Sequence, residues 1–198
     1  MAKLLVSLLL MLFITAFVHA DEYYWVNGSG YWSDTSHWAT TSGGSIYYSD
    51  VPGPNDTVFF DAASFSSNGK IITVDMSMAN CALMDWSGVA YNVEFNSGTL
   101  DTLNVFGHLI LSDKVAFNFS GLLRLHGLTN ATTYFESQNK SLKCDVELAA
   151  DTLLMTGALQ LPYNRLLHTD GVFNANGYRV ACRHFNTDSS RMAAVPVV

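Results

Sequence analysis

Short strand-like runs, separated by Gly, Asn, Ser and Asp, follow one another through the chain after residue 69. We predict strands at 71–74, 91–95, 102–106, 109–111, 115–119, 122–125, 132–135, 146–148, 152–155 and 178–181. No stretch repeats its apolar residues with helical spacing over three turns. Many short strands at similar spacing predict an all-β fold.

A weak internal repeat accompanies these runs. The segment DTLNVFGHL at 101–109 aligns with DTLLMTGAL at 151–159, and LLRLHGL at 122–128 is a partial third copy. A strand that ends in Gly and restarts with Leu, recurring at about 20 to 30 residues, is typical of a solenoid coil. Gly supplies the positive φ of a corner, and the aliphatic residues stack inward. The pattern favours a parallel β-helix, with a β-sandwich as the alternative.

Asparagine recurs in similar local contexts along this region. We expect Asn96, Asn104, Asn118, Asn174 and Asn176 to stack in ladders at the corners of a solenoid. Because stacked strands lie ~4.8 Å apart, five or so coils would form a rod about 24 Å long. A solenoid this short needs capped ends.

The first 20 residues have the pattern of a secretory signal peptide. Lys3 precedes an apolar run over 4–18, and the segment closes on Val18-His19-Ala20. We expect cleavage after Ala20 and a secreted or cell-surface location. The run is too short to cross a bilayer of ~30 Å comfortably, so we expect no membrane span after cleavage.

The rest of the chain divides by composition. Residues 21–67 hold three tryptophans and are loop-like and rich in Gly, Ser, Thr, Asn and Asp. Turn formers lie at 42–45 and 51–56, and a short β-type run lies at 57–60. We expect 21–67 to be a capping segment, 68–187 the β-helix coils, and 188–198 a C-terminal tail.

The net charge of the chain limits the class of molecule that it can bind. The chain carries a formal net charge of −7, and the leader contributes only the positive charge of Lys3. An acidic chain without a basic patch is a poor ligand for nucleic acid. The three cysteines, Cys81, Cys144 and Cys182, are odd in number and far apart. They are compatible with one disulfide and a spare thiol, or with three small buried side chains.

The stretch YWVNGSGYWSDTSHW at 24–38 holds three tryptophans. In one interpretation Trp25, Trp32 and Trp38 are exposed and stack on sugar rings, while Asn27 and Asp34 hydrogen-bond the hydroxyls. In the other, the aromatic rings cap the open end of the β-helix, which must be covered. The stretch directly precedes the first predicted strands, and this position favours the cap.

Two longer patterns carry a resemblance. Trp25, Gly28, Gly30, Trp32, Ser33, Asp34 and Trp38 match W-x-G-G-x-G-x-W-S-D-x-x-x-W, with Asn27 at a usual Gly. Val51, Pro52, Asp56, Val58, Phe60 and Asp61 match V-P-x-x-x-D-x-V-x-F-D, and GVFNANGYRV at 171–180 resembles a closing coil. The chain thus resembles modules of bacterial surface and secreted proteins of the adhesin-like and autotransporter-passenger-like kind, and more loosely G8-type β domains. The resemblance implies a right-handed parallel β-helix on or outside a cell.

Metal and catalytic chemistry have weaker support. Asp50, Asp56 and Asp61 lie close in sequence and could gather around Ca²⁺, although Asp56 also suits a turn after Pro54-Asn55. The histidines show no paired zinc spacing, and no nucleophile elbow or phosphate loop occurs. Many β-helical enzymes cleave polysaccharides, so we consider a lyase or hydrolase that uses acidic residues of one groove. The candidates for that groove are Asp145, Glu147 and Asp151, with Lys143 nearby.

These observations predict a non-catalytic extracellular structural or adhesin-like β-helix module. Its expected partners are an extracellular polysaccharide or another component of a host or cell surface. A carbohydrate-binding module is the first alternative, and a polysaccharide-cleaving enzyme the second. The tail at 188–198 has no evident cap. Either this tail lies over the last coil, or further coils or another chain contact it, or the chain is a fragment of a longer protein, and we expect the fragment.

Overall fold

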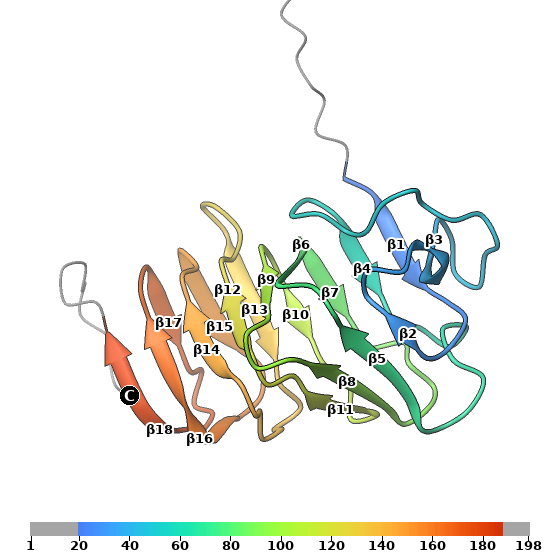
Figure 1. Ribbon diagram of the computed structural model, residues 1–198. Helices are drawn as coiled ribbons and strands as arrows, with labels where there is room; N and C mark the ends of the chain where they lie inside the picture. Colours follow the sequence, from blue (N-terminus) through green and yellow to red (C-terminus); the bar gives the residue numbers. More distant parts are fainter. Residues whose placement is uncertain (1–19, 188–198) are drawn as a thin grey trace, which may run out of the picture.

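The computed structural model describes residues 20–187, and their strands form three sheets (Figure 1). Sheet A contains β1 (Glu22–Trp25), β3 (Trp38–Ala39), β4 (Thr57–Phe59), β7 (Leu83–Asp85), β10 (Leu109–Ile110), β13 (Thr132–Glu136), β15 (Thr152–Met155) and β17 (Val172–Asn174). Sheet B contains β2 (Gly30–Tyr31), β5 (Lys70–Val74), β8 (Val93–Ser97) and β11 (Val115–Asn118). Sheet C contains β6 (Met78–Cys81), β9 (Thr102–Val105), β12 (Leu122–Leu125), β14 (Asp145–Leu148), β16 (Leu159–His168) and β18 (Val180–Thr187).

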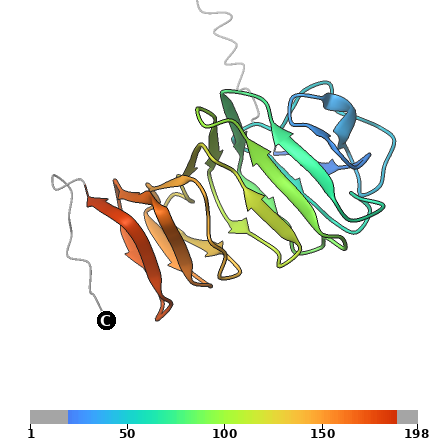
Figure 2. The same cartoon turned by 60° about the horizontal axis from the view of Figure 1, so that its bottom comes forward.

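The chain visits the sheets in turn and so winds into a solenoid of about six turns. The strands β4, β5 and β6 make one coil, β7, β8 and β9 the next, and β10, β11 and β12 the third. From β13 onward the chain passes from sheet A to sheet C with only an isolated bridge between, at Ser141 and Gln160. Figure 2 shows the same order of coils from β1 to β18. The all-β parallel β-helix is confirmed, while its right-handed sense stays a prediction.

Neighbouring coils pair in parallel through nearly the whole described chain. Thr57 pairs with Leu83 near the start, Thr102 with Leu122 in sheet C, and Thr152 with Val172 near the end. The exception is β3, which runs antiparallel to β1 and ends sheet A. A β-sandwich, which is built from antiparallel sheets, does not describe this arrangement.

The internal repeat predicts only part of the strand pairing between coils. Leu122 does lie beside Thr102 in sheet C, one coil on, as the partial copy predicts. The longer alignment fails, because residues 102–105 belong to sheet C whereas residues 152–155 belong to sheet A. The two segments share a local pattern of inward aliphatic residues, since each coil presents the same alternation on every side.

After residue 69 each predicted strand overlaps an observed one, although the prediction at 178–181 shares only residues 180–181 with β18, and several observed strands were not predicted. Four of them, β6, β7, β16 and β17, lie in the region of the coils, and β1, β2 and β3 lie in the segment expected to be loop-like. Its short run at 57–60 corresponds to β4. The only helix among residues 20–187 is the 3₁₀ turn η1 (Thr35–His37), and no helix there is long and apolar enough to span a membrane.

The core consists of inward side chains stacked from coil to coil. Strand residues alternate between buried and half-exposed, as in β14 and β15, because successive side chains of a strand point to opposite faces. Aromatic rings continue this stacking: Phe60 lies on Trp86 with centroids 3.6 Å apart, and Phe95 lies on Phe117 at 5.2 Å. Full burial of one such ring contributes about 1.5–3 kcal/mol.

Candidate functional site

The three tryptophans of the N-terminal segment form one buried cluster. Trp25, Trp32 and Trp38 are each 0% exposed. Trp38 meets Trp25 edge-on at 4.9 Å and Trp32 at 4.8 Å between ring centroids. Phe60 and Phe95 close the cluster from the following coils, at 5.9 Å from Trp25 and 6.2 Å from Trp32. The faces of the three rings are therefore covered by the protein itself and offer no surface on which a sugar could stack.

Hydrogen bonds fix two of the indole rings inside this cluster. The Nε1–H of Trp25 donates to the carbonyl oxygen of Gly28 at 2.7 Å, and that of Trp38 donates to the carbonyl oxygen of Trp32 at 2.9 Å. The indole nitrogen of Trp32 has no partner among the described residues. Burial of this unpaired N–H costs free energy, which the ring's packing against its aromatic neighbours offsets.

Asn27 and Asp34, the predicted sugar-binding polar residues, shape the backbone of the same segment. Asn27 lies at φ 66° and Gly28 at φ 77°, so the chain turns sharply just after Trp25. The side-chain amide of Asn27 donates to the carbonyl oxygen of Ser36 at 2.9 Å. The Asp34 carboxylate caps η1 by accepting from the Ser36 N–H at 2.9 Å. Both side chains thus contact the turn rather than an open surface groove.

His37 is a member of this cluster that the sequence did not reveal. Its ring stacks on Trp25 with centroids 4.6 Å apart and planes 8° from parallel, and its Nδ1 lies 2.7 Å from the carbonyl oxygen of Val26. A Cβ atom at Gly30 would lie 2.0 Å from its Nε2. This close approach therefore requires Gly at position 30. In the sequence, only the Gly of the tryptophan pattern pointed to this packing.

The three aspartates predicted to hold Ca²⁺ each accept a hydrogen bond from the protein, and two of them shape turns. Asp56 accepts from the Gly53 N–H at 2.8 Å, as the turn interpretation predicts. Asp61 accepts from the Ala63 N–H at 2.9 Å, and Asp50 accepts from the hydroxyl of Tyr23 at 3.2 Å. Residues 20–187 contain no group of three or more His, Cys, Asp or Glu side chains placed to hold a metal ion.

The cysteines lie in the solenoid wall without a disulfide among them. Cys81 and Cys144 are buried, and Cys182 is half-buried near the last coil. Burial raises the pKa of the Cys144 thiol to about 12 and that of Cys81 further. Two of the three therefore act as small apolar core residues with inert thiols.

A row of polar side chains runs along the outer face of sheet C. The Asn104 amide donates to Asn80 Oδ1 at 2.9 Å, one coil back, and His126 Nε2 lies 3.3 Å from Asn104 Oδ1. Arg124 donates from Nε to Glu147 at 2.9 Å, again across one coil boundary. The expected asparagine stacking thus occurs in part, on strand faces rather than at corners: Asn104 contacts Asn80 in sheet C, and Asn118 lies beside Asn96 in sheet B.

The acidic residues considered for catalysis each have a partner within the solenoid. Asp145 accepts two side-chain hydrogen bonds from Arg165, at 2.9 and 2.6 Å. Glu147 pairs with Arg124 at 2.9 Å, and Asp151 accepts from the backbone N–H of Asn130 at 2.7 Å. Lys143 donates to Asn118 at 2.8 Å on the side of sheet B. These contacts link neighbouring coils and do not bring the four side chains into one groove.

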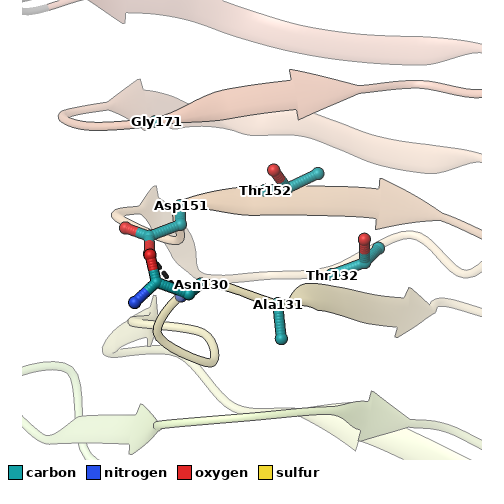
Figure 3. A pocket seen from close by; sticks show the side chains of 6 residues that line it. All are labelled: Asn130, Ala131, Thr132, Asp151, Thr152 and Gly171. Atoms are coloured by element: carbon teal, nitrogen blue, oxygen red, sulfur yellow. Dashed lines mark hydrogen bonds between the residues drawn. The ribbon is translucent and has the colours of Figure 1, made fainter.

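A shallow hollow of about 560 Å³ lies where β13, β15 and β17 begin (Figure 3). Its walls are Asn130, Ala131, Thr132, Asp151, Thr152 and Gly171. Its polar side chains are the hydroxyls of Thr132 and Thr152 from adjacent strands, the Asn130 amide and the Asp151 carboxylate, and this carboxylate accepts from the Asn130 backbone N–H. Gly171 is at φ 72°, and a Cβ there would lie 1.9 Å from the Ala150 carbonyl oxygen. The hollow therefore lies between the tight turns that precede β13, β15 and β17.

No protein family, no curated protein and no solved structure matches this chain. The resemblance to adhesin-like β-helix proteins therefore rests on the quoted residues alone and stays a prediction. Residues 1–19 of the predicted leader at 1–20, and the predicted tail at 188–198, lie outside the described residues.

Proposed function

We propose that this chain is an exported, non-catalytic structural module of the adhesin-like kind, which presents flat β surfaces outside the cell. The predicted leader supports export. The parallel solenoid supports a structural role, because stacked coils give an elongated body whose every coil is held by its neighbours.

One observation carries the proposal: the tryptophans that suggested sugar binding, and two of the carboxylates that suggested catalysis, are used to join coils. The tryptophans pack against rings from the next coils, as Trp32 does against Phe95. The Arg124–Glu147 and Arg165–Asp145 pairs each cross a coil boundary in sheet C. Such contacts stiffen the solenoid, and this is what a surface-displayed structural element requires.

The last coil supplies the surface for a partner. Within the described residues, β17 ends sheet A and β18 ends sheet C, so each has one edge without a strand beside it. Val172 is 46% exposed and Phe185 50% exposed on these two strands. Exposed strand edges with apolar side chains pair readily with another strand. The proposed occupant is a further parallel β coil.

A polysaccharide panel tests the non-catalytic structural role against its two alternatives. The mature chain, residues 21–198, is titrated with soluble neutral and acidic polysaccharides while tryptophan fluorescence and the release of shorter sugars are followed. We expect neither a saturable fluorescence change nor product. A saturable change with one polysaccharide would instead establish a binding module, and product release would establish an enzyme.

Light scattering after size-exclusion chromatography tests the edge of the last coil. Because β17 and β18 each have an unpaired edge within the described residues, the mature chain should show a mass that rises with concentration, and Phe185→Lys should suppress that rise. Tyr134→Lys is the matched control, because Tyr134 is 44% exposed but lies on β13, which has strands on both sides in sheet A. A constant monomer mass, or equal effects of both variants, would contradict the docking role.

A further inference from the structure

The backbone nitrogen of Asp21 lies against a carboxylate at the start of the solenoid. Its N–H donates to Asp56 Oδ1 at 2.9 Å, across 35 positions of sequence. The other oxygen of that carboxylate accepts from the Gly53 N–H at 2.8 Å, which fixes its orientation. The Asp21 carbonyl oxygen in turn accepts from the Thr57 N–H at 2.8 Å. Asp21 is thus held on both sides by the segment that leads into β4.

The corner around this contact is strongly acidic. Asp21, Glu22, Asp50 and Asp56 all lie there, near the stacked rings of Tyr23 and Tyr48. Burial raises the pKa of Tyr23, and the carboxylates of Asp50 and Asp56 raise it further. Within residues 20–187, no lysine or arginine forms an ion pair with Asp50 or Asp56. A positive charge placed in this corner would be strongly favoured.

Ala20, the residue before this contact, is exposed, and it is the last residue of the predicted leader. Hydrolysis of the Ala20–Asp21 peptide bond by a leader peptidase adds water across the bond. The carbonyl carbon of Ala20 takes the hydroxyl and becomes a carboxylate, while the nitrogen of Asp21 becomes an α-amino group. That amine carries a positive charge near neutral pH, where its ordinary pKa is about 7.7–8.0.

We propose that removal of the leader creates an ion pair between the α-ammonium group of Asp21 and the carboxylate of Asp56, which locks β1 onto β4 in the mature protein. The nitrogen is already at hydrogen-bonding distance, so the pair forms without movement of the chain. In the precursor the same nitrogen is a neutral amide and makes only the weaker bond. Maturation therefore strengthens the first coil, into which the tryptophan cluster is packed.

The inference rests on the export part of the proposed function, and thermal melting tests it without any ligand or assembly. Three forms are compared at one low protein concentration: the chain starting at Asp21, the same chain with one added Gly before Asp21, and the uncleaved precursor. We expect the form starting at Asp21 to melt about 2–4 °C above the Gly-extended form. The precursor, whose Asp21 nitrogen is also an amide, should resemble the Gly-extended form.

Substitution of the carboxylate separates the ion pair from other effects of the added residue. In an Asp56→Asn background the difference between the two N-termini should disappear, while in an Asp50→Asn control it should persist. Equal melting of both N-termini in the unsubstituted protein, or a difference that survives Asp56→Asn, would overturn the proposal. Mass spectrometry of the exported protein must also give Asp21 as the first residue, and another start would refute the lock.

A chemical measurement covers the case in which Asp56→Asn does not fold. The α-amine of Asp21 is labelled with an acylating reagent near neutral pH, and its rate is compared with that of the same amine in urea. An amine paired with Asp56 should react at least several-fold more slowly in the folded protein. Equal rates would contradict the pair. Failure of the proposed structural role would appear only in the polysaccharide and light-scattering experiments.

Discussion

At the scale of single residues, the N-terminal segment shows how a sequence typical of a binding platform becomes a core. Gly30 leaves room for the His37 ring, which stacks on Trp25, and this brings the rings of the segment together. Trp32 then reaches Phe95, which belongs to β8. The large aromatic side chains of the segment join the first coil to the coils that follow.

Replacement of Trp32 by Ala should therefore destabilise the fold severely. Removal of a fully buried Trp leaves a large cavity, and the expected loss is about 3–5 kcal/mol of unfolding free energy. Urea denaturation followed by circular dichroism measures it. Tyr31→Ala is the neighbouring control, because Tyr31 is 58% exposed and its loss should change stability by no more than about 0.5 kcal/mol. Similar midpoints for the two variants would show that Trp32 is not a core residue.

At the scale of elements, stability depends on pairs that cross from one coil to the next. The ion pair between Asp145 at the start of β14 and Arg165 in β16 is the clearest example. Partial burial acts to raise the pKa of Asp145, but the hydrogen bonds and charge of Arg165 outweigh it, so that pKa lies below its usual value. The folded state therefore favours the ionised form.

This shift has a definite sign in the stability. A depressed carboxyl pKa contributes stability above the unfolded value of about 3.9, and the contribution is lost as the pH falls through the lower folded value. Asp145→Asn should thus destabilise the protein at pH 7, and its deficit relative to the wild type should shrink below about pH 4. Urea midpoints across this range measure it, with Arg165→Gln expected to behave alike. A deficit that is constant with pH would contradict the assignment.

At the scale of the whole molecule, cysteine reactivity reports on the closed wall of the solenoid. Cys81 lies in β6 of sheet C, and Cys144 directly precedes β14 of the same sheet. Both are fully buried, and burial raises the pKa of each thiol. In the native mature protein we expect a thiol reagent at pH 7 to label Cys182 first and the other two at least tenfold more slowly. In urea all three should react alike. Rapid labelling of Cys81 without denaturant would indicate an open wall.

The coils could be predicted from sequence because their alternation is local. The runs at 102–105 and 122–125 have strand-like patterns, and each occupies its expected strand. The strand β6, with sequence MANC, has no β-branched residue and was not predicted. Nor was β1, which ends one residue before the Asn27-Gly28 turn. Their strand character comes from the neighbouring coil, which supplies the hydrogen bonds.

The roles of the candidate site residues were harder to predict, because they too depend on contacts with residues far along the chain. A Trp flanked by Gly and Ser looks alike in a sugar platform and in a core, and only the position of Phe95, far along the chain, distinguishes them. The turn role of Asp56 is local and could be predicted, whereas its contact with Asp21 crosses 35 residues and could not. Pairing between coils depends on the register, and the weak repeat gave it only for residues 102–105 and 122–125.

The central claim is that the tryptophans belong to the core of a structural solenoid, and fluorescence quenching tests it most directly. All four tryptophans of the chain, Trp25, Trp32, Trp38 and Trp86, are fully buried, so the emission of the whole protein reports on this claim. We predict blue-shifted emission of the native mature chain that acrylamide quenches only weakly and that polysaccharides leave unchanged. Red-shifted emission, quenched by acrylamide as strongly as in urea, would contradict the account.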